Sequence, residues 1–285
     1  MARRRSSRVL PFILVGLTVG LSTSGPIAAG EAANMDPSGT WAMVQITSEI
    51  TQIPIVGERT RTTAAHLKVT IERKQDAFAV FETLCVSNID DGTPMVKTTI
   101  PDAFVASVPV TERSAYLEPV SQTEQPAGDS NAQLRIVFPW STQVLGAQLE
   151  DPENEQLPTD PEDPRVVDQD GDGHPGLTVR VEIMNLISGE VYVVQRNRNR
   201  LTGTVESAGF FQGTIEWESE QVVLGASNPF LASGGTGTPD PDPEHNFFLA
   251  KRIDPELDCE EVKSLDLMLL KELTPPQEGS EHPEI

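Results

Sequence analysis

Apolar and polar residues alternate along most of this chain with the two-residue period of β-strands that have one buried face. The strand-like segments are residues 42–50, 66–72, 77–88, 95–100, 111–120, 134–145, 179–183, 191–205, 210–223 and 245–253. In the first segment we expect Ala42, Val44 and Ile46 to form the buried face. The pattern predicts an all-β fold with an antiparallel sheet, either a barrel or a sandwich.

Two other segments predict helical structure. Prolines bracket residues 101–109, which favours a short helical turn or an irregular plug. Apolar residues at helical spacing predict an amphipathic C-terminal helix over 260–273, and a disordered tail is expected over 275–285.

A hairpin is predicted from the two longest strand-like segments near the end of the chain. Its expected register places Arg196 opposite Glu218 and Arg198 opposite Glu216. These would be cross-strand ion pairs on the solvated face.

The composition changes abruptly between Glu150 and Asp172, where ten acidic residues accompany a single basic residue, Arg165. Such a segment buries too little apolar surface to fold alone, so it is either a loose linker between two domains or a loop organised by a cation. Because long loops in compact domains are usually functional, we favour one β domain over 34–274 with an acidic insertion at 148–176.

The most specific chemical signal is the stretch Asp168-Gln-Asp-Gly-Asp-Gly-His-Pro-Gly176. Carboxylates at alternate positions converge on one point, and Gly173 allows the sharp bend. The stretch resembles the calcium loops of EF-hand proteins and, more closely, the shortened aspartate loops of dockerins and thrombospondin type 3 repeats. The resemblance implies that calcium is bound by the carboxylates of Asp168, Asp170 and Asp172 and by the backbone carbonyl of His174.

The stretch departs from an EF-hand at its last position. Val179 stands where the bidentate glutamate is needed, so Glu182, Asp160 or Asp163 would complete the shell, or water would. Prolines on both sides exclude flanking helices. We therefore expect a weak extracellular-type site with a Kd of about 10⁻⁴ to 10⁻³ M. A solvated acidic turn without an ion is the alternative.

The first residues indicate export. Four arginines precede an apolar run and a stretch of small residues, which predicts a signal peptide over 1–33 and a secreted or periplasmic protein. A retained anchor is the alternative, and no later segment approaches the roughly 20 apolar residues that cross a bilayer. The formal net charge of −22 becomes more negative without those arginines, which argues against nucleic acid as a partner.

Cys85 and Cys259 are the two cysteines of the chain. In an exported protein an even count predicts a disulfide, here one that ties the C-terminal segment to the body of the fold. Two unpaired buried thiols are the alternative.

Gly39-Thr-Trp41 at the start of the first strand resembles the Gly-x-Trp signature of lipocalins, which are antiparallel barrels that carry small apolar ligands. A late-strand arginine such as Arg196 or Arg198, the C-terminal helix and the disulfide fit this resemblance, whereas the second lipocalin signature, Thr-Asp-x-x-x-Tyr, is missing. The resemblance implies that Trp41 closes one end of the barrel. An ordinary core tryptophan in another β fold is the alternative.

Signatures of catalysis are missing from the sequence. The four histidines are scattered, and neither a His-Glu-x-x-His nor a Gly-x-Ser-x-Gly motif occurs. We expect a secreted, non-enzymatic, calcium-binding β protein that acts as a binding or structural module. A lipocalin-like carrier of a small hydrophobic ligand is the second hypothesis, which an apolar, open-mouthed cavity would favour. A secreted hydrolase is the third.

Overall fold

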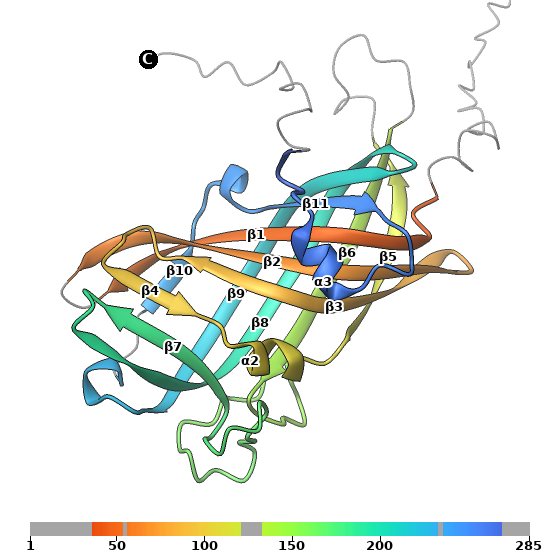
Figure 1. Ribbon diagram of the computed structural model, residues 1–285. Coiled ribbons are helices and arrows are strands. Elements are labelled where there is room, and N and C mark those ends of the chain that lie inside the picture. The colour runs from red at the N-terminus through yellow and green to blue at the C-terminus, as the bar shows by residue number, and fades with distance from the viewer. Residues whose placement is uncertain (1–35, 54–55, 121–132, 233–235, 270–285) are drawn as a thin grey trace, which may run out of the picture.

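The computed structural model describes residues 36–53, 56–120, 133–232 and 236–269 (Figure 1). The predicted signal peptide and disordered tail lie outside these residues. The strands are β1 (Gly39–Ile53), β2 (Gly57–Lys74), β3 (Ala77–Asp90), β4 (Val96–Thr99), β5 (Thr111–Pro119), β6 (Leu134–Leu145), β7 (Leu177–Ile183), β8 (Ile187–Ser207), β9 (Phe210–Ala226), β10 (Thr236–Pro239) and β11 (Phe247–Arg252). The helical elements are α2 (Asp102–Ser107), α3 (Cys259–Ser264) and the 3₁₀ turns η1 (Pro229–Leu231) and η2 (Pro243–His245).

The strands form one antiparallel sheet that closes into a ring, which confirms the all-β prediction (Figure 1). Around the ring the order is β1, β2, β3, β5, β6, β8, β9 and β11, and β11 pairs with β1 to complete the circuit. β8 is 21 residues long and pairs with β9 along one edge and with β6 along part of the other. Closure gives the backbone groups of these strands partners on both sides.

One end of the ring, which we call the wide end, contains two further strands. There the first seven residues of β8 pair with β7 instead of β6, and β4 pairs with the far edge of β7. The helix α2 contacts both β3 and β7 and closes the gap between them. The buried carboxylate of Asp91 fixes the turn from β3 to β4, because it accepts hydrogen bonds from the backbone N–H and the hydroxyl of Thr98 at 2.7 and 2.9 Å.

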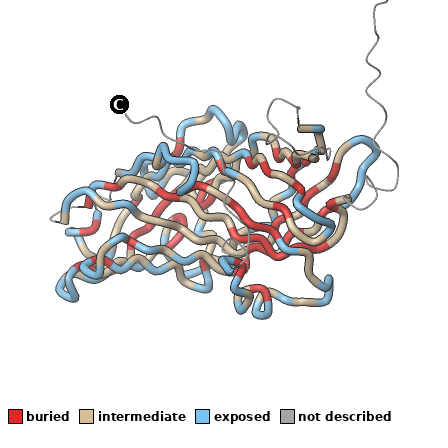
Figure 2. Tube along the Cα trace, turned by 90° about the horizontal axis from the view of Figure 1, so that it is seen from above, coloured by how far each residue is buried: buried red, intermediate tan, exposed pale blue. Residues whose placement is uncertain are grey.

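Side chains fill the narrow end of the ring. Trp41, Phe138, Phe211 and Phe248 are almost fully buried there, and neighbouring rings lie with centroids 4.6 to 6.3 Å apart. Aliphatic side chains of β2, β3 and β8 pack around them. Buried residues accordingly gather toward the middle and right of Figure 2, whereas the wide end at the left is mostly intermediate or exposed.

Trp41 is a buried core side chain at the narrow end of the ring. Its indole N–H donates to the backbone carbonyl of Pro37 at 2.7 Å. The guanidinium of Arg252 lies 4.3 Å from the centre of its ring. The arginine beside this tryptophan is therefore Arg252, and not Arg196 or Arg198, whose side chains pair with glutamates of β9.

Both faces of the first part of β1 are buried. Ala42 and Val44 are buried as predicted, and their face lies outside the ring, in a cluster with residues of the C-terminal segment. The inward face carries Trp41 and Met43 and then polar residues from Gln45 onward, which line a cavity. Polar residues that face an internal cavity have the same alternation as residues that face solvent, so the pattern alone does not say which face is interior.

The C-terminal helix is shorter than predicted. A capping box between Asp258 and Glu261 starts α3, and the helix ends at Ser264 because Leu265 adopts an extended conformation. This change of direction buries Leu267 on the outside of the sheet. The predicted disulfide is confirmed, since Cys259 of α3 is bonded to Cys85 of β3.

The register predicted for the hairpin of β8 and β9 was wrong by two residues. Arg196 lies opposite Glu220, Arg198 opposite Glu218 and Arg200 opposite Glu216. All three pairs are ion pairs, with shortest N–O distances of 3.1, 3.3 and 2.6 Å. A bulge between Val205 and Ser207 sets the register, and a two-residue shift keeps every side chain on its predicted face.

Replacing both Cys85 and Cys259 with alanine should lower the free energy of unfolding by roughly 4–5 kcal/mol, because the bond closes a long loop in the unfolded chain. The two cysteines are 174 residues apart in sequence. Chemical denaturation of the variant and of the reduced wild type should give the same loss. A variant as stable as the oxidised wild type would show that α3 is held by packing alone.

Candidate functional site

The three aspartates of the predicted calcium loop lie together. One carboxylate oxygen from each of Asp168, Asp170 and Asp172 comes within 4.8 Å of the others. Gly173 has a φ of +88° and makes the sharp bend for which glycine is needed. This cluster, which we call the aspartate loop (residues 168–176), has the geometry of a group that could hold a metal ion.

Hydrogen bonds already shape the aspartate loop. The two carboxylate oxygens of Asp168 accept the backbone N–H groups of Asp172 and Gly173, at 3.1 and 2.9 Å. Asp172 accepts the N–H of His174 at 2.9 Å. The negative charges are thus brought together by the backbone, which lowers the ordering cost of binding a cation.

Thr178, at the start of β7, joins the loop to the sheet. Its backbone N–H donates to Asp170 Oδ2 at 2.8 Å, and its hydroxyl donates to Asp172. Asp170 Oδ1 is buried and accepts no hydrogen bond from the described residues. A buried carboxylate oxygen without a donor is a fitting ligand for a hard cation, and the all-oxygen donor set suits calcium or magnesium. Sequence reasoning missed Thr178.

The other predicted ligands have different surroundings. The imidazole of His174 stacks on Tyr192 with ring centroids 4.2 Å apart. Glu182 lies further along β7, opposite Lys97 of β4, and is not part of the aspartate cluster. Asp160 caps its own turn by accepting the N–H of Glu162 at 2.9 Å, and Asp163 binds an arginine. The described residues thus place three carboxylates at the site and leave the remaining ligands to carbonyl groups or water.

Gln169 fastens the aspartate loop to two further elements. Its side-chain oxygen accepts the N–H of Gly146, after β6, at 2.7 Å, and its amide nitrogen donates to the carbonyl of Ser107, the last residue of α2, at 3.1 Å. The loop is therefore attached to β6, α2 and β7, all at the wide end of the ring.

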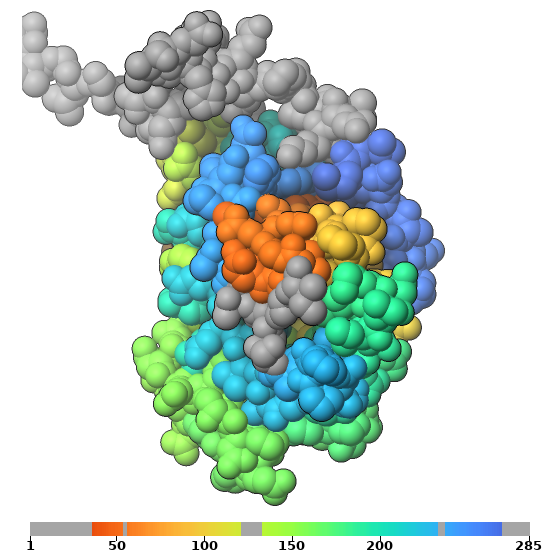
Figure 3. Space-filling view, turned by 90° about the vertical axis from the view of Figure 1, so that its left-hand side faces the viewer, coloured from red at the N-terminus to blue at the C-terminus, as the bar shows by residue number. Residues whose placement is uncertain are grey.

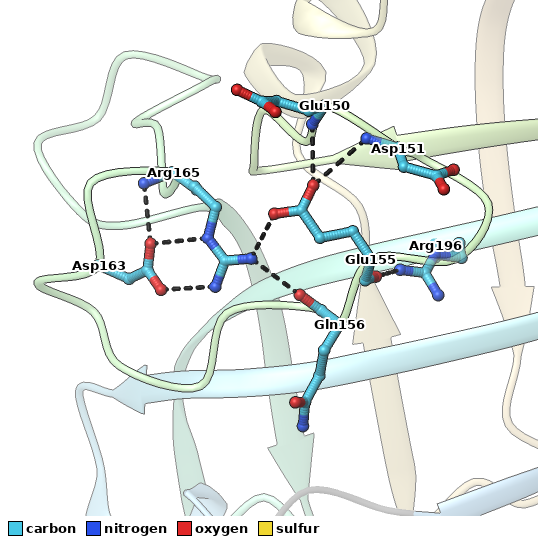
Figure 4. Close-up of polar contacts among 7 residues, drawn as sticks. All are labelled: Glu150, Asp151, Glu155, Gln156, Asp163, Arg165 and Arg196. Atoms are coloured by element: carbon cyan, nitrogen blue, oxygen red, sulfur yellow. Dashed lines mark hydrogen bonds and ion pairs between the residues drawn. The ribbon is translucent and has the colours of Figure 1, made fainter.

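Arg165 organises the rest of the acidic insertion (Figure 4). Its guanidinium binds Asp163 through two nitrogens, with N–O distances of 3.0 and 2.7 Å, and Glu155 at 2.8 Å, and it donates to the carbonyl of Gln156 at 3.0 Å. These bonds lower the pKa of Asp163 to about 2 and raise that of Arg165. We call Arg165 and its three partners, Asp163, Glu155 and Gln156, the clamp. Arg196 of β8 donates to the carbonyl of Glu155 and so fixes the clamp to the sheet.

A small apolar cluster lies beneath this clamp. Leu157 of the insertion is buried against Val194 of β8 and Leu224 of β9, on the outside of the ring. The insertion is therefore packed on the sheet and is not a loose linker. The composition did not reveal these contacts, because one arginine and a few apolar residues are enough when a sheet provides the other half of the interface.

A cavity of about 600 Å³ lies inside the wide end. One wall is apolar and comes from β4, α2, β7 and the first half of β8; it includes Val96, Ile100, Phe104, Val179, Val181 and Ile183. The opposite wall comes from β1, β2 and β9 and carries mainly hydroxyl, amide and paired charged groups. Its lining extends to η1 and to the end of β1, which lie at the end of the molecule that faces the viewer in Figure 3; we call this end of the cavity its mouth.

Glu82 and Arg113 lie at the inner end of the cavity, above the aromatic core. Both side chains are almost fully buried, and Glu82 Oε1 lies 3.9 Å from Arg113 Nη1. Burial raises the pKa of the Glu82 carboxyl, and Arg113 opposes part of that shift. Sequence reasoning missed both residues; the available signal was a charged side chain at an inward position of an otherwise apolar strand.

Comparison of the chain with protein-family models, curated proteins and solved structures found no match. Within the described ranges, no helix has the length and apolar character that a membrane crossing requires.

Replacing Arg165 with methionine should loosen the insertion, because three acceptors lose their donor while the apolar cluster remains. Hydrogen exchange of peptides covering 148–167 should become faster, and exchange in β8 and β9 should not change. The matched control is Arg180→Met, which removes an exposed arginine that pairs with Glu190 outside the insertion.

The clamp should also respond to acid. The pKa of Asp163 is lower in the folded protein than its ordinary value of 3.8, so its contribution is present above that value and is lost as the pH falls through about 2. Exchange protection of the insertion should therefore survive at pH 4 in the wild type and be absent at pH 4 in Arg165→Met. Loss of protection near pH 6 in the wild type would contradict this assignment.

Proposed function

We propose that this protein is an extracytoplasmic binding protein that holds a small, largely apolar molecule in the cavity of its wide end. The observation that carries the proposal is the cavity itself, because a ring of strands that served only as a structural module would be filled along its whole length. Small-molecule sites are typically clefts or cavities of roughly 300–1,000 Å³ with apolar walls and a few polar groups, and a volume of about 600 Å³ lies within that range.

The rim of the wide end supports this role. Four large apolar side chains are exposed there: Met95, Met184, Leu186 and Phe230. Phe230 is 77% exposed and also lines the cavity, so the cavity and the outer surface meet at the side chain of Phe230. An apolar rim gives a ligand contact with protein before it has left water completely.

Binding fits the cavity better than catalysis. The carboxylates that line the cavity each lie against an arginine: Glu49 is 3.0 Å from Arg61, Glu218 is 3.3 Å from Arg198, and Glu82 has Arg113 beside it. A catalytic pair of carboxylates needs one group to be held protonated beside an ionised partner. Burial raises the pKa of Glu82, but its charged neighbour is Arg113 and not a second carboxylate.

The disulfide supports an extracytoplasmic location, because such bonds persist in oxidising compartments. The lipocalin resemblance supports a carrier role to the extent that Trp41 packs where the motif implies. The signal peptide remains a prediction from residues 1–33.

As a second function we propose that the aspartate loop binds calcium. The cluster of Asp168, Asp170 and Asp172 and the buried, unpartnered oxygen of Asp170 support a cation. Calcium is favoured over magnesium because a loop with variable ligands and water suits its larger and more flexible coordination shell. The ion would stiffen the loop at the start of β7.

The cavity proposal predicts that filling the apolar wall abolishes binding. 1-Decanol should displace the fluorescent probe N-phenyl-1-naphthylamine from the wild type, and each added methylene in an alcohol series should tighten binding by up to about fourfold. Val181→Trp should prevent both events, because Val181 faces the cavity from β7.

Leu269→Trp is the matched control, since it adds the same side chain at a position that is 54% exposed and does not line the cavity. Ala65→Phe provides a second filling variant from the opposite wall. Circular dichroism and thermal unfolding establish that the variants are folded. Undiminished binding by both filled variants would place the probe outside the cavity and contradict the proposal.

The calcium proposal predicts that 2 mM calcium raises the midpoint of thermal unfolding by roughly 2–6 °C relative to chelator, as expected for a Kd of about 0.1–1 mM. Asp170→Asn combined with Asp172→Asn should abolish the shift. Glu153→Gln combined with Glu162→Gln removes the same charge from exposed positions of the insertion and should leave the shift intact. Equal shifts in the two double variants would mean that calcium acts only as a diffuse counterion.

A further inference from the structure

Glu82 has an acceptor that the protein itself does not use. It projects from β3 into the ring, and its side chain is 7% exposed, at a position that lines the cavity. Its Oε1 atom is buried and accepts no hydrogen bond from the described residues. The distance of 3.9 Å from Oε1 to Arg113 Nη1 is longer than a hydrogen bond. Buried carboxylates are normally hydrogen-bonded, so a donor on a bound ligand could satisfy this oxygen.

The two terminal nitrogens of Arg113 are engaged elsewhere, whereas its Nε is buried and has no acceptor among the described residues. Its Nη1 donates to the side chain of Asn199 at 2.7 Å, and its Nη2 donates to the carbonyl of Pro139 at 2.6 Å. These carbonyl and amide groups belong to β8 and to the bulge in β6, where the ladder leaves backbone acceptors open. Turning the guanidinium toward Glu82 would leave those groups without donors, so its present orientation is favoured.

The charges on the cavity wall are already paired. Beside the Glu82–Arg113 pair, Arg61 lies within 3.2 Å of both Glu49 and Asp91. A charged group on a ligand would enter a buried site without a free counter-charge, and its desolvation would not be offset. An uncharged N–H or O–H group has no such cost and satisfies the carboxylate.

The apolar wall lies between this polar point and the mouth. Phe104 of α2 and Val181 of β7 belong to that wall, and Leu231 of η1 lines the cavity near the mouth. A molecule that reached Glu82 with one end would therefore lay the rest of its length against apolar side chains.

We propose that the cavity selects an amphipathic molecule whose uncharged, hydrogen-bond-donating head group, an alcohol or an amide, donates to Glu82, while its apolar part lies along the wall formed by β4, α2 and β7. This inference rests on the proposed binding function and names its specificity-determining residue. Glu82 is then a ligand-binding residue. Arg113 is the positively charged neighbour that holds the carboxylate in place without donating a hydrogen bond to its Oε1 atom.

Three ten-carbon compounds that differ only in the head group test the inference at pH 7: 1-decanol, decylamine as its ammonium ion, and decanoate. Each is titrated as a competitor of N-phenyl-1-naphthylamine, whose fluorescence reports its displacement. We expect 1-decanol to bind at least tenfold more tightly than either charged compound. We expect Glu82→Met to weaken 1-decanol roughly tenfold, after correction for the affinity of the variant for the naphthylamine, whose own N–H can also donate to Glu82.

Two further variants sharpen the result. Glu82→Gln keeps an acceptor oxygen without the charge, and it should bind 1-decanol within a few-fold of the wild type. Glu112→Met is the matched control, because Glu112 is the exposed neighbour of Arg113 on the outer face of β5. If Glu82→Met does not fold, the proposal is still tested by Glu82→Gln, by Glu112→Met and by the head-group series on the wild type.

The inference is overturned if decylamine binds most tightly and loses affinity in Glu82→Gln, since that outcome assigns a cationic ligand. It is equally overturned if decanoate binds most tightly, which would indicate a protonated Glu82 beside Arg113. Binding of the naphthylamine with no head-group preference refutes the role of Glu82 and leaves the proposed function standing. If neither the naphthylamine nor any ten-carbon compound binds, the proposed function and this inference both fail.

Discussion

Closure of the sheet by the ladder between β8 and β9 is the constraint on which the rest of this structure depends. The ladder runs from Val191 opposite Ala226 to Ser207 opposite Phe210. At its narrow end the inward residues, such as Leu201, are apolar and fully buried. Toward the wide end they become Asn199, Asn197 and Gln195, which line the cavity. A single pair of strands thus produces a packed core at one end of the ring and an internal space at the other.

The sequence predicted the strands well because a two-residue period is a local property. The limits of β6 match the predicted segment 134–145, and most other strands begin and end within a few residues of the expected positions. The period does not say which face is interior, and β1 shows why: a cavity makes inward positions polar, and the packing of α3 makes outward positions apolar. The short strand β10 is not among the predicted segments, because its four residues become a strand only by pairing with β1.

The candidate sites likewise differ in whether they are formed by residues close in sequence or by strands that pair in the fold. The aspartate loop could be predicted because its three aspartates lie within five residues and its bend needs a glycine. The local signal for Glu82 and Arg113 is only a charged residue at an inward strand position, and their proximity depends on the pairing of β3 with β5, which the sequence does not show. Arg165 could be recognised as the one base among ten acids. Its contacts with Asp163 and Glu155 depend on the fold of the insertion, which a composition count cannot show.

The aspartate loop and the cavity share one strand, and the structure indicates how strongly they influence each other. Thr178 donates to two of the three aspartates, and its neighbour Val179 lines the cavity. Coupling between two sites requires an element with two arrangements that both ligands bias. β7 is paired along both edges, with β4 through four residue pairs and with β8 through seven, which favours a single arrangement. A cation at the loop would therefore stabilise the wall of the cavity without tuning its affinity, and the two proposed sites would then be a structural support and a binding site on the same rigid strand.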